Sequence, residues 1–174
     1  MAGLAHAQIT VGSSGSNTTD ATIYSGAQSL TKTGSNIVTL TGTNTYSGGT
    51  IINGGVLQVA SDAQLGATSG GITLNGGQIY NSASFTLNAN RTITLGASGG
   101  YFQSSWQKIL TIAGQITGAG GLGVAWDNGT VLLSGSNNYA GTTTVGTSGN
   151  NSWGSVGAGG IFLSVKLLKS QQAG

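Results

Sequence analysis

Residues able to do acid–base or metal chemistry are few in this chain of 174 residues. The only acidic side chains are Asp20, Asp62 and Asp127, Glu and Cys are absent, and His6 is the single histidine. A zinc site needs several Cys, His or carboxylate ligands, and Ca²⁺ takes about 6–8 oxygen ligands. We therefore predict no catalytic residue, no cofactor-binding residue and no metal site.

The spacing of the aspartates also argues against glycosidase or lyase chemistry. Cleavage of a glycosidic bond uses two carboxyl groups roughly 5–9.5 Å apart. With a structural repeat of about 22 residues, Asp62 and Asp127 lie about three repeats apart, or ~14 Å at the ~4.8 Å spacing of strands. We interpret Asp20, Asp62 and Asp127 as corner residues that form local Asx turns.

Charge and hydropathy exclude two further classes of partner. Lys32, Arg91 and Lys108 balance the three aspartates, and the remaining cations, Lys166 and Lys169, lie in the C-terminal tail. No basic stripe is present to contact phosphates, so nucleic acid is not an expected partner. No run of 18 apolar residues occurs, so no transmembrane segment is expected.

Aromatic and threonine side chains leave a binding function open. The aromatic residues either stack on sugars or cover glycine-rich corners, and we favour the second role because two of them occupy equivalent repeat positions: Trp106, Trp126, Trp153, Tyr46 and Tyr139. Pairs such as Thr39/Thr41 and Thr92/Thr94 resemble an ice-binding face. In the sequence these pairs do not recur at a fixed register, and Thr is common on strand surfaces.

The elements that position these residues are short strands separated by glycine and asparagine. The expected strands are Gln8–Val11, Ala21–Tyr24, Ile37–Thr41, Thr50–Ile52, Val56–Val59, Gly71–Leu74, Gln78–Tyr80, Ser84–Leu87, Thr92–Leu95, Tyr101–Phe102, Ile109–Ala113, Thr130–Ser134 and Thr142–Val145. Alternation of side chains places one set inside: Val38, Leu40, Ile51, Leu57, Val59, Ile72, Leu74, Ile79, Phe85, Leu87, Ile93, Leu95, Leu110, Ile112, Val131 and Leu133. It places another set in solvent: Thr39, Thr41, Thr73, Thr86, Thr92, Thr94 and Thr111.

Two internal repeats indicate how the strands are arranged. Residues 44–50 return at 137–143, and residues 48–55 return at 70–77, a shift of 22. A period of about 20–25 residues is typical of a β-solenoid. We therefore predict an all-β fold, a single-stranded parallel β-helix with about 20–25 residues per turn. Asn53-Gly54-Gly55 and Asn75-Gly76-Gly77 are expected to be equivalent corners with a glycine at positive φ, and Leu40, Leu57 and Leu74 to share one column.

The expected domain organisation is one solenoid over residues 8–165. Residues 1–7 are expected to be a signal-peptide remnant, because Ala5-His6-Ala7 has the small-x-small form of a cleavage site. Residues 161–169 predict a last strand or a short amphipathic helix, and residues 166–174 form a C-terminal tail.

One ordered motif carries a family resemblance. Leu30-Thr31-Lys32, residues 38–50 (VTLTGTNTYSGGT) and residues 53–59 (NGGVLQV) resemble the autotransporter-associated β-strand repeat, also called the passenger-associated transport repeat. A weaker copy lies at 122–145. The resemblance implies a right-handed parallel β-helix in the surface-exposed passenger of a type V secretion protein, and no particular enzymatic activity.

The expected function follows from this resemblance. It is a non-enzymatic stalk of a secreted or cell-surface protein of a Gram-negative bacterium, adhesive and assisting passenger export. Host surface or extracellular matrix glycans are the expected partners. The family also implies an outer-membrane β-barrel translocator, whose sequence signature is absent from this chain. The alternatives are a β-helix carbohydrate-active enzyme and a glycan- or ice-binding module.

Overall fold

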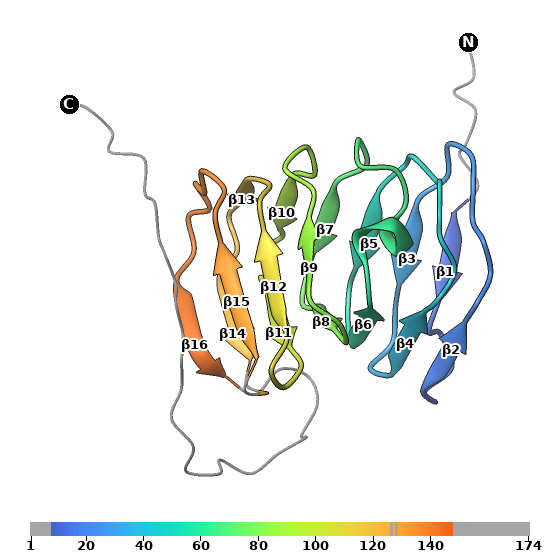
Figure 1. Cartoon of the computed structure of the whole chain (residues 1–174), viewed down its shortest axis with the longest axis horizontal. Helices are drawn as coiled ribbons and strands as arrows, with labels where there is room; N and C mark the ends of the chain where they lie inside the picture. Colours follow the sequence, from blue (N-terminus) through green and yellow to red (C-terminus); the bar gives the residue numbers. More distant parts are fainter. Residues whose placement is uncertain (1–7, 126, 128, 148–174) are drawn as a thin grey trace.

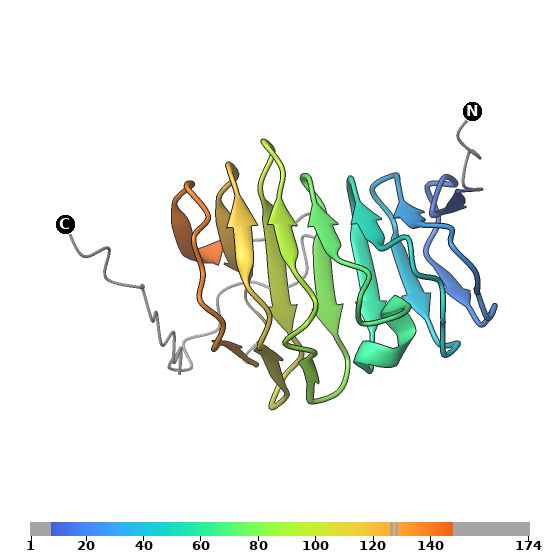
Figure 2. The ribbon, with the colours of Figure 1, turned by 90° about the horizontal axis from the view of Figure 1, so that it is seen from above.

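The computed structural model describes residues 8–125, 127 and 129–147. This part of the chain winds into coils that stack along one axis, as Figures 1 and 2 show from two sides. Strands of neighbouring coils pair in parallel, and in the six-stranded sheet the paired residues are 20 to 23 positions apart, from Leu30↔Thr50 to Ile93↔Ile116. The predicted parallel β-solenoid and its coil length are therefore confirmed.

Each coil contributes to up to three parallel sheets. Sheet A contains β1 (Ile9–Val11), β3 (Leu30–Lys32), β5 (Thr50–Ile52), β7 (Ile72–Leu74), β10 (Ile93–Leu95) and β13 (Ile116–Gly118). Sheet B contains β2 (Thr18–Asp20), β4 (Ile37–Leu40), β6 (Val56–Val59), β8 (Gln78–Asn81), β11 (Gly100–Ser104), β14 (Leu122–Ala125) and β16 (Thr143–Thr147). Sheet C contains β9 (Phe85–Leu87), β12 (Ile109–Ile112) and β15 (Thr130–Leu133). A 3₁₀ helix, η1 (Asp62–Leu65), takes the third side of the third coil.

The core is a continuous column of aliphatic side chains inside the coils. Most predicted core residues are buried there: Val38, Leu40, Leu57, Val59, Ile72, Leu74, Ile79, Leu87, Ile93, Leu95, Leu110, Ile112, Val131 and Leu133. Phe85 packs against this core while remaining partly exposed. Of the threonines predicted to face solvent, Thr41, Thr86, Thr92 and Thr94 are exposed, and the other three are half-buried.

Two expectations about the core are wrong. Ile51 does not face inward; Thr50 and Ile52 do, because the register pairs Ile52 with Leu74 of the next coil. Leu40, Leu57 and Leu74 are all buried, but they do not share a column. Leu40 and Leu57 belong to sheet B and Leu74 to sheet A, because the chain from Leu57 to Leu74 runs only part of the way round one coil.

Several strand boundaries also differ from the prediction. The predicted strand at Ala21–Tyr24 is irregular, and the second strand of that coil is instead Thr18–Asp20. Strands β3, β13 and β14 were missed. Their sequences, LTK, ITG and LGVA, lack a clear alternation of apolar and polar residues. Each is a strand because the coils on its two sides present matching backbone groups.

The two Asn-Gly-Gly corners lie in adjacent coils, as predicted, but they turn differently. Gly55 has φ 60° in the first corner, whereas Gly76 has φ 94° in the second. These are the third and second residues of their corners, so the positions are not equivalent. Gly77 is needed for space instead, since a Cβ there would lie 2.2 Å from Cγ2 of Ile52.

Three expectations fall outside the described residues. These are the signal-peptide remnant at 1–7, the solenoid beyond residue 147, and the strand or helix at 161–169 with the tail at 166–174. Among the described residues, no helix is long and apolar enough to cross a membrane.

Candidate functional site

Asp20 forms the Asx turn expected of it. Its carboxylate accepts a hydrogen bond from the Thr22 amide at 2.9 Å and another from the Tyr24 hydroxyl at 2.8 Å. Burial alone would raise the pKa of Asp20, but the hydrogen bonds from Thr22 and Tyr24 lower it overall. The pKa of Tyr24 is raised by burial and by this contact with the carboxylate. Asp20 therefore organises a corner of the first coil.

Asp62 is not a local turn residue; it pairs with a distant, fully buried arginine. Nε of Arg91 donates to Oδ1 of Asp62 at 2.9 Å, and Nη2 donates to Oδ2 at 3.1 Å. The guanidinium also donates to the carbonyl oxygens of Leu65, Gly66, Ala67 and Gly70. Arg91 has no exposed surface. With its donors satisfied by protein oxygens, this pair closes the corner around η1 and offers no free acid for chemistry.

Asp127 likewise makes a long-range contact, where a local Asx turn was expected. It accepts a hydrogen bond from the Tyr80 hydroxyl at 2.7 Å. Burial raises the pKa of Tyr80, and the neighbouring Asp127 carboxylate raises it further. Asp62 lies in the third coil and Asp127 follows β14 of the sixth, in agreement with the predicted separation of three turns. The described residues contain no group of three His, Cys, Asp or Glu side chains that could hold a metal.

Lys32 is a second buried cation, held by oxygen atoms of two coils. Its Nζ donates to the carbonyl oxygens of Thr33 at 2.5 Å, Gly34 at 3.0 Å and Gly54 at 3.2 Å, and to Oδ1 of Asn36 at 3.2 Å. Desolvation lowers the pKa of Lys32 to about 8. The side chain is fully buried, so this lysine holds the corner between sheets A and B.

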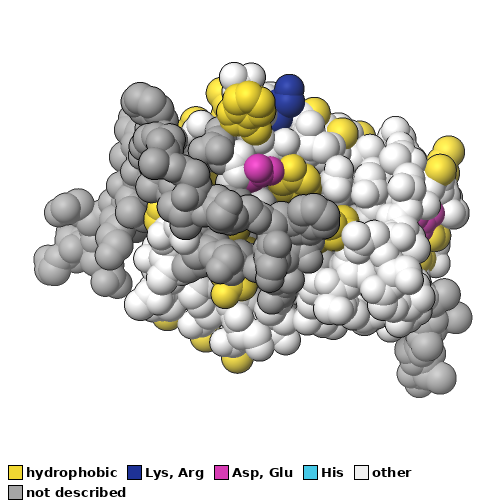
Figure 3. Space-filling model, turned by 90° about the horizontal axis from the view of Figure 1, so that it is seen from below, with side chains coloured by type: hydrophobic (Ala, Val, Ile, Leu, Met, Phe, Trp, Pro, Cys, Tyr) yellow, Lys and Arg dark blue, Asp and Glu magenta, His cyan; other side chains and the backbone are white. Residues whose placement is uncertain are grey.

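The aromatic residues in the described part of the chain differ in their burial. Tyr46 is fully buried, and its ring lies against Gly66, where a Cβ would be 2.7 Å from the ring. It covers a glycine corner, as predicted. Trp106 is 65% exposed, whereas Trp126 and Trp153 lie outside the described residues. Figure 3 shows one face of the molecule, on which charged side chains are few and isolated.

The Thr-x-Thr pairs do not recur at a fixed register, in agreement with the sequence interpretation, but single threonines do. One outward position of sheet A forms a single file across all six strands: Thr10, Thr31, Ile51, Thr73, Thr94 and Thr117. Thr31 in this file is covered, and Gln8 donates a hydrogen bond to its hydroxyl. A second file of threonines would lie two residues before or two residues after this one along each strand. Only Thr92 lies two residues before the file, and only Thr33 lies two residues after it. The described part of sheet A therefore carries no two-file array of the Thr-x-Thr kind.

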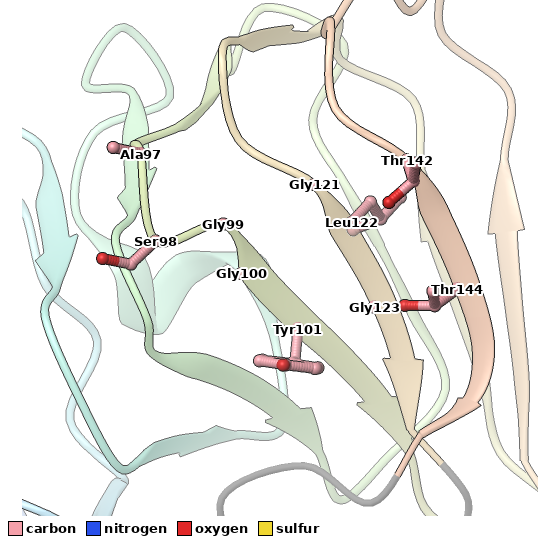
Figure 4. Close-up of a pocket in the computed structure, with 10 residues that line it drawn as sticks. All are labelled: Ala97, Ser98, Gly99, Gly100, Tyr101, Gly121, Leu122, Gly123, Thr142 and Thr144. Carbon is pink, nitrogen blue, oxygen red and sulfur yellow. The ribbon is translucent and has the colours of Figure 1, made fainter.

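A groove lies on the outer face of sheet B, over the last three strands of that sheet in the described part of the chain. Tyr101 of β11 pairs with Gly123 of β14, which pairs with Thr144 of β16. Figure 4 shows the Tyr101 ring on one side, Thr142 and Thr144 on the other, and Gly121 and Gly123 between them. The groove has a volume of about 210 Å³, and none of its lining residues is charged.

Sequence reasoning missed Arg91, Lys32 and this groove. A lone cation in a chain so poor in charge is the one signal that could have pointed to Arg91 and Lys32, because buried charges need partners. The groove leaves a weaker signal. Gly123 follows Tyr101 by one coil, so a glycine replaces an aromatic residue at the same register.

Comparison with known proteins gives two matches. Residues 30–59 and 124–150 match the family model described as passenger-associated-transport-repeat. The adhesin BmaC autotransporter of Brucella suis biovar 1 (strain 1330) is 37% identical over 152 residues, which are 85% of this chain and 4% of that protein. No solved structure gives a significant match. The chain thus belongs to the passenger-associated transport repeat proteins, which are secreted or exposed at the cell surface of Gram-negative bacteria.

Proposed function

We propose that this solenoid is a non-enzymatic segment of an adhesive autotransporter passenger, which spaces and presents binding surface outside the cell. The observation that carries the proposal is the 37% identity to an autotransporter adhesin over 85% of the chain. The chain spans only 4% of that relative's length. Adhesion is therefore proposed for the protein of which such a segment forms part, with host surface or extracellular matrix glycans as partners.

The architecture suits a spacer. Each inner coil pairs on both sides with its neighbours, so a longer rod needs more coils but no new kind of core. The carboxylates are engaged with Thr22, Tyr24, Arg91 and Tyr80, which supports a structural role for the few charges present. Coils that emerge in order would each be stabilised by the one before, so folding outside the cell would favour export.

Surface display tests the proposal. The full chain, carrying an epitope tag, is fused to a heterologous autotransporter translocator in a non-adherent Gram-negative host. Adherence is then measured on immobilised matrix and mucin preparations. We expect adherence above that of cells displaying only the tag, at equal tag exposure. Equal adherence of the two strains would refute the adhesive role, and turnover of pectin, alginate or a glucan by the purified chain would refute the non-enzymatic one.

A further inference from the structure

The groove on sheet B exists because one file of side chains is interrupted. Tyr101, Gly123 and Thr144 are partners on three consecutive strands, so the tyrosine and the threonine are two strand spacings apart, roughly 9.6 Å. Gly123 places no side chain between them, and Gly121 adds a second gap beside it (Figure 4). The result is a slot with an aromatic wall, a backbone floor and a hydroxyl wall.

The chemistry of the lining selects a neutral ligand rich in hydroxyl groups. Ser98, Thr142 and Thr144 supply hydroxyls that both donate and accept hydrogen bonds, and all three residues are exposed. No lining residue carries a charge, so a phosphate, carboxylate or ammonium group would find no counter-ion. The phenol ring of Tyr101 offers an apolar face with a polar tip, which suits a ligand with an apolar face of its own.

The size of the groove sets the size of the ligand. At about 210 Å³ it is smaller than the roughly 300–1,000 Å³ sites that enclose drug-sized molecules. It has room for one ring and leaves the groups on either side in solvent. An internal or terminal unit of a longer chain can therefore enter.

We propose that this groove binds one neutral sugar unit of a glycan, with the ring of the sugar against Tyr101 and its hydroxyls paired with Thr142 and Thr144. This assignment rests on the proposed adhesive function and gives it a site. The ligand class is a neutral hexose or N-acetylhexosamine polymer, whose rings combine an apolar face with hydroxyl edges. Charged glycans, such as sialylated or sulfated chains, are not accommodated by the lining.

The test uses the full chain labelled with ¹⁵N and a panel of neutral hexasaccharides of glucose, mannose, galactose and N-acetylglucosamine. We expect at least one of them to give saturable shift changes in residues 97–101, 121–123 and 142–144. Tyr101→Ala should weaken that binding at least tenfold, and Thr144→Val should weaken it several-fold. Trp106→Ala, which removes an exposed aromatic side chain outside the groove, is the matched control and should bind as the parent does. Circular dichroism should show that every variant is folded.

Three results would overturn the assignment: no saturable binding of any neutral hexasaccharide, binding that Tyr101→Ala leaves unchanged, or binding that is lost in Trp106→Ala. Displayed cells separate this inference from the proposed function. If Tyr101→Ala cells adhere as the parent cells do, the groove is not the adhesive site, although the adhesive role stands. If the groove binds a hexasaccharide but displayed parent cells do not adhere, the adhesive role fails while the binding site stands.

Discussion

The two repeat copies, residues 30–59 and 124–150, use the same local motif in different surroundings. In the first copy the Tyr46 hydroxyl lies 2.6 Å from Oγ1 of Thr50, and in the second the Tyr139 hydroxyl makes the same contact with Thr143 at 2.5 Å. Yet Tyr46 is fully buried, whereas Tyr139 is partly exposed. The contact belongs to the motif, and the burial comes from the coils around it.

The copies also occupy different sides of the solenoid. Thr50 belongs to β5 of sheet A, whereas Thr143 belongs to β16 of sheet B. Val38 lies in sheet B, and its partners lead coil by coil through that sheet to Val124. The repeat shift instead aligns Val38 with Val131, which lies in sheet C. The motif has therefore advanced by one side, and it is a strand–corner–strand unit that occupies different sides of the coil in its two copies.

The largest effect on the free energy of unfolding is expected at Arg91, which supports the first copy but not the second. Arg91 donates to the carbonyl of Leu65, which also accepts a hydrogen bond from Thr50, the partner of Tyr46. Arg91→Met would leave the Asp62 carboxylate without its counter-ion and several buried carbonyls unpaired, at a cost of about 3–5 kcal/mol. Urea unfolding would measure the loss. Lys108→Met, the same kind of change at an exposed position, should cost less than about 0.5 kcal/mol, and equal losses in the two variants would contradict the assigned role.

A smaller difference is expected from the tyrosines themselves. Tyr46→Ala opens a cavity in a closed corner and should cost about 3–5 kcal/mol, as other buried aromatic truncations do. Tyr139→Ala, at the partly exposed equivalent position, should cost about half of that or less. The two variants are matched in chemistry, so the difference in unfolding free energy isolates the contribution of the surrounding coils. If both lose the same stability, burial by neighbouring coils is not what distinguishes the copies.

The fold and the coil length could be predicted from the sequence, whereas the threonine file, the role of Arg91 and the groove could not. The coil length and the fold follow from the repeated corners and from the alternation within strands such as Val56–Val59. The threonine file on sheet A was missed because its steps are unequal, the step from Thr31 to Ile51 being shorter than that from Thr94 to Thr117. Corners of variable length absorb the difference, so a constant sequence period does not exist. Arg91 and the groove depend on contacts between coils, which no local pattern encodes.

The smallest expected effect concerns a residue that only the first copy has. Lys32 corresponds to Ala125 at the repeat shift, and desolvation lowers the pKa of Lys32 from 10.5 to about 8. Between these two values the unfolded chain binds more protons at this site than the folded chain does, so the free energy of unfolding should rise with pH. The burial penalty is fully present below about pH 8 and is relieved above it. The gain should be of the order of 2 kcal/mol between about pH 8 and 10.

Ionisation of the tyrosines limits this rise in the free energy of unfolding at high pH. Burial raises the pKa of Tyr46 to about 12, so above about pH 10 the unfolded chain loses the phenol proton first and stability falls again. Urea unfolding at several pH values should therefore show a maximum near pH 10. Lys32→Met should remove the rise, and direct NMR titration of the Lys32 side chain serves if that variant does not fold. A Lys32 that titrates near 10.5 would show that the oxygen atoms around Nζ fully replace its hydration. A rise that persists in Lys32→Met would show that another group causes it.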